Sequence, residues 1–379
     1  MKEHDVSTQA QTPAALVIGA GVIGLSTAIT LRQHGWRVTV AAADSGPGIV
    51  STVAGALWEW PPSVCGRHHD ETLLEQSKSW AMVSYRQFQH LATHPEHTGV
   101  HLRPAVSYFH RPVDEQPLEL AKMHEVAAHV PGFAHDPGLI DRHGINPRAG
   151  VLDAYQYTAP MVDTDRYNAW LRDQALATGV RLVPRRITGD LRDHESALLT
   201  EFDADVIVNC SGLGARELAG DTTLSPHRGA LLWLRNDGTS MPRITTAHAL
   251  ANDPSSPQQD MVFIVPRGQD RLLVGGIVED GTWNTDLTPD NYPPVRDMLR
   301  RCQEFLPALA DAELDTDDPV RVGLRPFRRD NVRLETEAGT RIVHNYGHGG
   351  AGVTLSWGCA DDATQLAHQL VGNTTAPAA

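Results

Sequence analysis

The segment that most constrains the fold of this chain lies near its N-terminus, where a glycine-rich turn joins an apolar run to a helical pattern. Residues 14–18 are apolar, Gly19-x-Gly21-x-x-Gly24 follows, and apolar positions recur at helical spacing through residues 21–34. A second short strand is expected at residues 37–40 and is followed by Asp44. This order of strand, turn, helix, strand and acid is typical of a dinucleotide-binding unit in a parallel sheet.

Each residue of this unit has a defined part in holding a dinucleotide. Gly19 permits the tight turn, Gly21 lets the backbone approach a pyrophosphate, and Gly24 lets the helix pack on the strand. The helix N-terminus presents partial positive charge to the phosphates. Asp44 is placed to accept hydrogen bonds from ribose hydroxyls, which disfavours a 2′-phosphate and hence NADP. The alternative is a glycine turn that binds no ligand.

A second glycine-dense block lies near the C-terminus. Residues 342–352 read Ile-Val-His-Asn-Tyr-Gly-His-Gly-Gly-Ala-Gly and lead into a helical pattern that begins at Val353 and Thr354. The glycines keep side chains off one surface, so backbone can approach a flat cofactor, and the helix N-terminus can stabilise negative charge on a reduced flavin ring. The alternative is a glycine-rich hairpin. Together the two blocks favour a flavin enzyme over a nicotinamide dehydrogenase, which would leave the second block unexplained.

A buried strand pattern at residues 202–209 runs into a Ser-Gly-x-Gly turn. In a doubly wound sheet ligands bind at the carboxyl ends of the strands, so Ser211 and Gly212 are placed to reach the cofactor. An ordinary strand-to-helix turn explains the same residues equally well.

One arginine lies within an apolar, strand-like segment, residues 322–328. Arg325 stands between Leu324 and Pro326, and a buried guanidinium needs an anionic partner, usually a carboxylate held by two hydrogen bonds. That carboxylate belongs either to a ligand or to this protein itself. The residues alone leave both readings open.

Composition excludes several other classes of function. The chain has 379 residues with 41% hydrophobic and 21% charged content, and 32 basic against 46 acidic side chains give a formal charge of −14. No basic run of the kind that binds nucleic acid is present. No apolar run approaches the roughly 20 residues of a membrane span, and residues 1–12 lack the apolar core of a signal peptide. We therefore expect a cytoplasmic protein with neither a nucleic-acid nor a membrane partner.

The cysteines and histidines give no metal pattern. Cys65, Cys210, Cys302 and Cys359 are scattered without metal-ligand spacing. The pairs His68-His69 and His344/His348 form no HExxH or Cys/His motif, so no metal site is expected.

The order of the patterns predicts two domains, of which one is discontinuous. Alternating helix and strand patterns occupy the start, middle and end of the chain, and β-rich segments fill the gaps. We expect residues 13–60, 150–225 and 315–372 to form the cofactor domain. Residues 61–149 and 226–314 form the substrate domain in this scheme, and residues 1–12 and 373–379 form flexible tails.

These motifs resemble the D-amino-acid oxidase family of FAD flavoproteins, which includes D-aspartate oxidase. The resemblance extends through most of the chain and is carried by the N-terminal glycine turn, Val-Ala-Gly-Ala-Leu-Trp at 53–58, Val-Asn-Cys-Ser-Gly at 208–212, Arg228-Gly229, Val-Gly-Gly-Ile at 274–277, Gly-Leu-Arg-Pro at 323–326, and the C-terminal block through Gly358 and Ala360. It implies an α/β fold, with a Rossmann-like, doubly wound FAD-binding domain and a substrate domain built on a mainly antiparallel β-sheet.

The resemblance also implies roles for individual residues. The implied cofactor-binding residues are Gly19, Ala20, Gly21, Val22 and Ile23 for the pyrophosphate, Asp44 for the ribose, Ser51, Thr52, Gly55, Ala56 and Leu57 for the phosphate and isoalloxazine, Ile187 with Ser211 and Gly212 for the adenosine part, and Gly349, Gly350, Ala351, Gly352, Val353 and Thr354 for the flavin ring. Arg325 matches the arginine that binds the substrate α-carboxylate. The Gly350 carbonyl would accept from the substrate amine, which makes Arg325 and Gly350 the expected catalytic residues.

Two departures from the family pattern bear on the substrate. The family's pocket tyrosines should fall near Gln259 and Phe263, and neither residue is tyrosine here. Weaker carboxylate binding, a rearranged pocket and a different substrate are all open. Glu59 follows Trp58 where the family more often has a neutral amide. The carboxylate either selects a basic or amine-bearing substrate or caps a loop.

The expected activity is FAD-dependent oxidative deamination of a D-amino acid. Hydride leaves Cα for non-covalently bound FAD, the imino acid hydrolyses to a 2-oxo acid and ammonia, and O2 is reduced to hydrogen peroxide. The alternatives are an oxidase of a secondary amine, glycine or an unusual biosynthetic amino acid, and a flavin-binding protein without catalysis. The sequence leaves open the substrate side chain, the attachment of FAD, oxidase versus dehydrogenase behaviour, and whether the protein is a homodimer.

Overall fold

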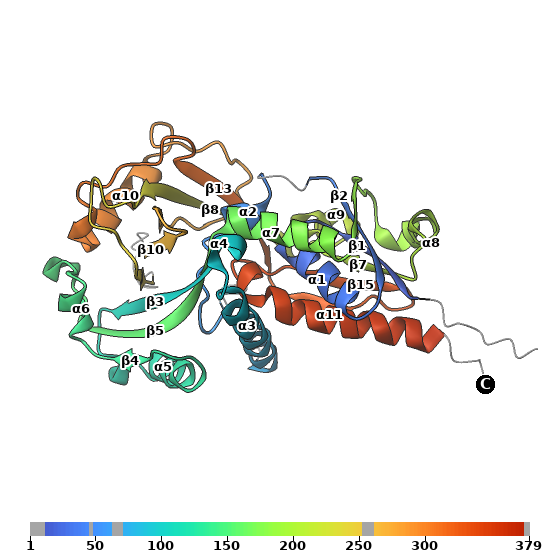
Figure 1. The fold of residues 1–379 in the computed structure, drawn as a ribbon, viewed down its shortest axis with the longest axis horizontal. Coiled ribbons are helices and arrows are strands. Elements are labelled where there is room, and N and C mark those ends of the chain that lie inside the picture. The colour runs from blue at the N-terminus through green and yellow to red at the C-terminus, as the bar shows by residue number, and fades with distance from the viewer. Residues whose placement is uncertain (1–11, 45–47, 63–70, 252–260, 375–379) are drawn as a thin grey trace, which may run out of the picture.

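A six-stranded, mostly parallel sheet forms one half of the molecule (Figure 1). The computed structural model describes residues 12–44, 48–62, 71–251 and 261–374, so Cys65, His68, His69 and Gln259 lie outside the described residues. The strands of the first sheet, in spatial order, are β14 (Arg333–Thr336), β15 (Ile342–Tyr346), β7 (Val206–Asn209), β1 (Ala14–Ile18), β2 (Arg37–Ala42) and β6 (Arg181–Pro184). Only β14 runs antiparallel to its neighbour. This is the doubly wound sheet that the glycine turn predicted.

A nine-stranded sheet forms the other half. Its spatial order is β12 (Glu279–Asp280), β8 (Leu224–Arg235), β11 (Arg271–Gly275), β10 (Val262–Arg267), β9 (Ala247–Leu250), β3 (Val100–Phe109), β5 (Asp153–Val162) and β4 (Ala134–His135), with β13 (Val320–Arg328) also paired to β8. Every pair is antiparallel except β3 with β9. The predicted fold class, a Rossmann-like part with a mainly antiparallel second sheet, is therefore confirmed.

Helices cover both sheets. Those of the parallel half are α1 (Val22–Gln33), α2 (Val50–Val53), α7 (Thr164–Ala177), α8 (Leu191–Phe202), α9 (Ala215–Leu218) and α11 (Gly352–Thr374). The others are α3 (Glu71–Leu91), α4 (Pro95–Thr98), α5 (Pro117–His129), α6 (Leu139–Arg142) and α10 (Pro293–Phe305), and short 3-10 turns occur at Val113–Glu115, Pro147–Ala149, Gly212–Gly214 and Pro307–Leu309.

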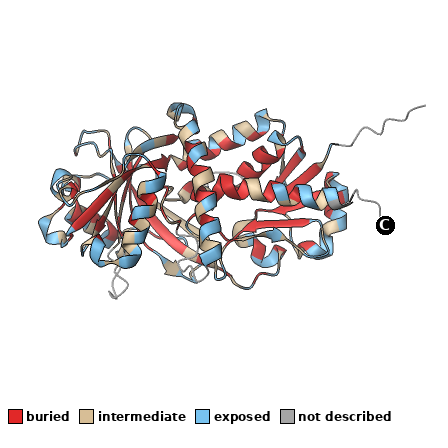
Figure 2. Ribbon diagram, turned by 90° about the horizontal axis from the view of Figure 1, so that it is seen from below, coloured by how far each residue is buried: buried red, intermediate tan, exposed pale blue. Residues whose placement is uncertain are grey.

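Helix α1 lies at the centre of the parallel half and is buried along most of its length (Figure 2). Every residue from 22 to 31 is buried, because the sheet covers one side and α11 lies alongside the other. Helix α3 crosses α11 at Gly358, where a Cβ would lie 2.3 Å from the Trp80 Cα. Trp80 Nε1 also donates to Asp362 Oδ2 at 2.7 Å. Gly358 therefore serves helix packing.

The two sheets share one core. A single cluster of buried residues contains Val17 of β1, Tyr157 of β5 and Leu355 of α11. The far face of the nine-stranded sheet packs on α10, whose buried residues Val295, Met298, Cys302 and Phe305 recur at helical spacing. The parallel half and the antiparallel half are thus joined through buried side chains on one face of the larger sheet.

Sheet membership differs from the predicted domain boundaries at two places. Strand β5 falls within residues 150–225, which were expected in the cofactor domain, but its ten-residue pairing with β3 places it in the nine-stranded sheet. Strand β13 falls within residues 315–372 and pairs with β8 of the same sheet. Strand β5 is mostly buried, whereas every residue of β13 is half-buried. We propose that the division between the domains follows the sheets.

Candidate active site

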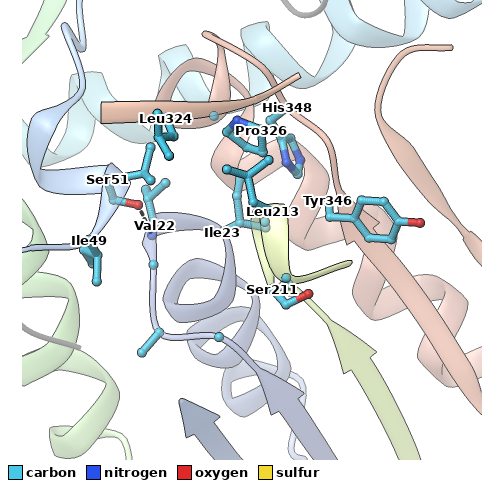
Figure 3. A pocket seen from close by; sticks show the side chains of 18 of the residues that line it. Val22, Ile23, Ile49, Ser51, Ser211, Leu213, Leu324, Pro326, Tyr346 and His348 are labelled. Atoms are coloured by element: carbon cyan, nitrogen blue, oxygen red, sulfur yellow. Dashed lines mark hydrogen bonds between the residues drawn. The ribbon is translucent and has the colours of Figure 1, made fainter. Parts of the chain in front are cut away.

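A cavity of about 500 Å³ opens at the carboxyl ends of β1, β2 and β7 and reaches across to β8 and β13. Figure 3 shows side chains from both halves of the molecule converging on it. The predicted residues in its wall are Gly19, Ala20, Gly21, Val22, Ile23, Asp44, Ser51, Gly55, Ile187, Ser211, Gly212, Arg325, Gly349, Gly350, Gly352 and Val353. The N-terminal and C-terminal glycine blocks thus line the same cavity, as their sequences predicted.

Seven predicted residues lie next to this cavity without forming its wall. They are Thr52, Ala56, Leu57, Glu59, Phe263, Ala351 and Thr354. Thr52 is buried and its carbonyl accepts from Thr164 Oγ1 at 2.6 Å. Leu57 forms a bridge with Met161 of β5. These contacts anchor α2 and the segment that follows it to α7 and β5. The residues between the two contacts are thereby held at the cavity.

The N-terminal glycine turn leaves no room for side chains. Gly19 has φ +111°, and a Cβ there would lie 2.5 Å from the Cys210 carbonyl oxygen. A Cβ on Gly24 would lie 1.9 Å from the Gly19 carbonyl oxygen, which explains the close packing of helix on strand. Val22 N–H at the start of α1 donates to Ser51 Oγ at 3.0 Å (Figure 3). The helix N-terminus therefore faces the cavity, ready for an anionic group.

The C-terminal glycine block forms the opposite wall. Gly347 and Gly349 have φ +84° and +54°, a backbone conformation that side-chain-bearing residues rarely adopt. Gly349 N–H donates to the Pro326 carbonyl at 2.9 Å, which ties the block to β13. Helix α11 then begins at Gly352. The block thus presents backbone, rather than side chains, to the cavity.

His348 is a wall residue that the sequence reasoning did not single out. It is 3% exposed and its ring lies in the wall beside Pro326 (Figure 3). Burial lowers the pKa of this imidazole to about 3, so it is neutral at physiological pH. Its position between Gly347 and Gly349 is the sequence feature that could have indicated a place in the cavity wall. Other wall residues that the sequence did not indicate are Ile49, Val53, Arg185, Leu213, Leu231 and Leu324.

Arg325 lies in the part of the cavity wall that β13 and β8 form. Its guanidinium packs against Gly229 of β8, where a Cβ would lie 2.2 Å from Nη1. Nη1 donates weakly to the Ile277 carbonyl at 3.5 Å, and no carboxylate of the described residues forms an ion pair with Arg325. Burial lowers its pKa, and the nearby charge of Glu59 opposes this. Of the two readings open at the sequence level, the structure favours a ligand carboxylate over a structural ion pair.

Phe263 and Glu59 are the two other predicted substrate residues. Phe263 is half-buried on β10, and a Cβ on Gly55 would lie 3.0 Å from its ring. Glu59 is half-buried in the segment after Trp58, and its charge acts on both Arg325 and Tyr157. Phe263 therefore packs on the predicted cofactor segment, and Glu59 is close enough for its charge to act on the guanidinium.

The cavity fits FAD by its construction. Glycines at 19, 21, 349 and 352 line it, two helix N-termini face it, and Arg325, which forms no ion pair with a described carboxylate, also lies in its wall. Within the described residues no group of three His, Cys, Asp or Glu side chains could hold a metal ion. In the same residues no helix is long and apolar enough to cross a membrane.

Known proteins match the chain along nearly its full length. The model of the FAD dependent oxidoreductase family matches residues 14–366. A D-amino-acid oxidase from Streptomyces coelicolor is 35% identical over 362 residues, covering 93% of this chain and 96% of the relative. One from Rubrobacter xylanophilus is 37% identical over 356 residues, covering 93% and 95%. The human D-aspartate oxidase is 29% identical over 371 residues, covering 95% and 96%.

Solved structures agree on the fold. Glycine oxidase from Bacillus cereus superposes with a TM-score of 0.73 at 18% identity and covers 96% of each chain. Together with the geometry of the cavity, the family match makes FAD the cofactor of this protein. The chain belongs to the D-amino-acid oxidase family of FAD-dependent oxidoreductases.

Proposed function

We propose that the protein catalyses the oxidative deamination of a D-amino acid. The observation that carries the proposal is Arg325, a half-buried guanidinium without a carboxylate partner among the described residues, in the wall of a cavity built for FAD. D-Amino-acid oxidases are also among the relatives that match the chain at 30% identity or more. The substrate loses a hydride from Cα and a proton from nitrogen, and the imino acid hydrolyses to a 2-oxo acid and ammonia.

Arg325 binds and orients the substrate. Its planar fork takes the α-carboxylate through two hydrogen bonds, which fixes the Cα–H bond relative to the cofactor. The Gly350 carbonyl, on the opposite wall, accepts a hydrogen bond from the amine. When bound, FAD would supply the hydride acceptor and the two-electron reduction of O2 to hydrogen peroxide.

The described wall contains no side chain suited to act as a general base at neutral pH. His348 has a pKa of about 3, and the Tyr346 hydroxyl donates to Asp221 Oδ2 at 2.9 Å. A base works best with a pKa near the working pH, so His348 is too weak. The substrate therefore has to enter with a neutral amine, and orientation with electrostatics supplies most of the catalysis.

The experiment is anaerobic titration of the purified holoenzyme with D- and L-amino acids, including acidic and basic ones. Bleaching of the oxidised flavin band by D-isomers, but not by their L-isomers, is the expected result. A yellow protein that no amino acid bleaches would overturn the proposal and leave FAD binding intact.

A second candidate is oxidation of glycine or a secondary amine. Phe263 motivates it, because a pocket without the tyrosine hydroxyl has lost one contact to the carboxylate. Bleaching by sarcosine or glycine and not by chiral D-amino acids would favour this candidate. A homodimeric state and a cytoplasmic location stay predictions.

A further inference from the structure

Arg267, the last residue of β10, is a buried cation outside the site described above. It is 1% exposed, and burial lowers its pKa to about 10, with the charges of Asp163 and Asp165 opposing the shift. Asp165 itself is paired with Arg321 at 2.7 Å, and no carboxylate of the described residues forms an ion pair with Arg267. A buried charge of this kind is costly to fold, so its contacts deserve a functional explanation.

The contacts of Arg267 lead to the segment after α2. Nη2 donates to the Ala54 carbonyl oxygen at 3.0 Å and also to the Gly55 carbonyl oxygen. Ala54 and Gly55 line the cofactor cavity, whereas Arg267 does not. The cavity therefore lies on the side of this segment away from the guanidinium.

The carbonyl orientation determines where the neighbouring N–H groups point. The peptide bonds that follow Ala54 and Gly55 are trans, so each C=O and the next N–H point in opposite directions. The N–H groups of Gly55 and Ala56 consequently point away from Arg267. Neither donates a hydrogen bond to another described residue. Two adjacent donors are left on the cavity side of the segment.

The segment would not keep this shape by local preference alone. Ala56 has φ +42°, a left-handed conformation that costs about 1 kcal/mol or more for a residue with a side chain. Val162 N–H holds the Ala56 carbonyl from one side at 3.0 Å, and Arg267 holds the two preceding carbonyls from the other. The conformation is therefore fixed by contacts from β5 and β10, both strands of the nine-stranded sheet.

We propose that Arg267 is a positioning residue for the cofactor. By holding the Ala54 and Gly55 carbonyls it turns the Gly55 and Ala56 N–H groups toward the cavity, where they donate to the bound flavin. Phe263 and Arg267 are four residues apart on β10 and so share one face of that strand. The strand that carries the predicted substrate residue thus also sets the cofactor's donors. The inference rests on FAD binding and is independent of which amine is oxidised.

The test compares three variants: Arg267→Met, Arg267→Lys and a control, Arg301→Met. Arg301 on α10 also donates to two backbone carbonyls, of Met261 at 2.8 Å and Gly276 at 3.3 Å, from the α10 side of the same sheet. Each apoprotein is titrated with FAD to obtain the dissociation constant, and the visible spectrum and flavin reduction potential of each holoprotein are recorded. Melting temperatures of the apoproteins report on folding.

R267M is expected to bind FAD at least tenfold more weakly than the wild type and to shift the flavin absorption bands and potential. R267K keeps a charged donor, so its FAD affinity and spectrum are expected to lie between those of R267M and the wild type. R301M is expected to bind FAD as the wild type does. Wild-type affinity and spectrum in R267M would overturn the proposal. Equal weakening in R267M and R301M would also overturn it, since that result would reflect general loosening of the sheet. If R267M does not fold, R267K decides, because a spectrum and affinity identical to wild type would contradict the two-carbonyl contact.

Discussion

Replacement of Arg325 by methionine separates the contribution of this residue to binding from its contribution to stability. The methionine side chain is apolar, flexible and of similar reach, so it fills the buried space beside Gly229 without a new polar group. Arg325 has no ion pair among the described residues and its pKa is lowered by burial, so the folded protein loses an unfavourable buried charge. The melting temperature of R325M is therefore expected to equal or exceed that of the wild type.

The cost to catalysis follows from the contacts that the guanidinium can make. Two hydrogen bonds between charged groups contribute ~1.5–3 kcal/mol each, so the loss of both removes about 3–6 kcal/mol of binding. At about 1.4 kcal/mol for each factor of ten, kcat/KM should fall by roughly 10²–10⁴. Because the carboxylate contact also orients Cα–H, part of the loss should appear in kcat.

The assay is oxygen consumption with the best D-amino acid found by flavin bleaching, together with flavin content and melting temperature. Arg325→Lys is the control, since it retains the charge and loses the fork, and it should recover part of the affinity. A variant R325M that keeps FAD, melts normally and retains more than a tenth of wild-type kcat/KM would refute the assignment of Arg325 to the substrate carboxylate.

Three further substitutions test the surroundings of the site. Glu59→Gln should lower kcat/KM for D-arginine and D-lysine relative to D-alanine by roughly 30-fold, since two charges about 8 Å apart would interact by ~2 kcal/mol at an effective dielectric constant near 20. An unchanged preference would make Glu59 a loop cap. Gly229→Ala should reduce kcat/KM at unchanged flavin content, because its Cβ would lie 2.2 Å from Arg325 Nη1. Burial alone would raise the pKa of Asp221, but hydrogen bonds from neighbours such as Arg328 hold that pKa well below its usual value. The ionised carboxylate therefore stabilises the fold above pH ~4, and this stabilisation is lost as the pH falls below that value. Asp221→Asn should lower the free energy of unfolding at pH 7 by roughly 3 kcal/mol and flatten its dependence on pH below about 4, as measured by denaturant titration.

The cofactor half of the site could be predicted from the sequence because its wall consists largely of backbone at glycines. Gly19, Gly24 and Gly349 are required by positive φ or by contacts of 1.9–2.5 Å at an added Cβ, and such requirements appear in a sequence as glycines at fixed spacing. The same spacing predicted the strand before the turn and the helix after it. Fold class and cofactor followed from this local information.

The substrate half of the site could be predicted only in part. Its residues are brought together by the pairing of antiparallel strands that lie far apart in the sequence. Arg325 reaches the cavity since β13 pairs with β8 along nine residues and brings its guanidinium over Gly229. Arg267 lies at the end of a strand whose neighbours in space, β9 and β11, do not reveal that it reaches back to Ala54. The pairing of β5 could not be predicted for the same reason, since its partner β3 is more than forty residues away in the chain.

The two halves of the site are in direct contact at Gly55, and this contact limits how the pocket can change. The Phe263 ring lies where a Gly55 side chain would be, with its Cζ 3.2 Å from the added Cβ. A hydroxyl on that ring carbon would extend from the edge that already packs on the cofactor loop. A side chain at residue 55 and a hydroxyl on residue 263 would therefore compete for the same space. Substrate preference at position 263 and cofactor positioning at position 55 are consequently coupled, so substitutions at one should be measured by their effect on the other.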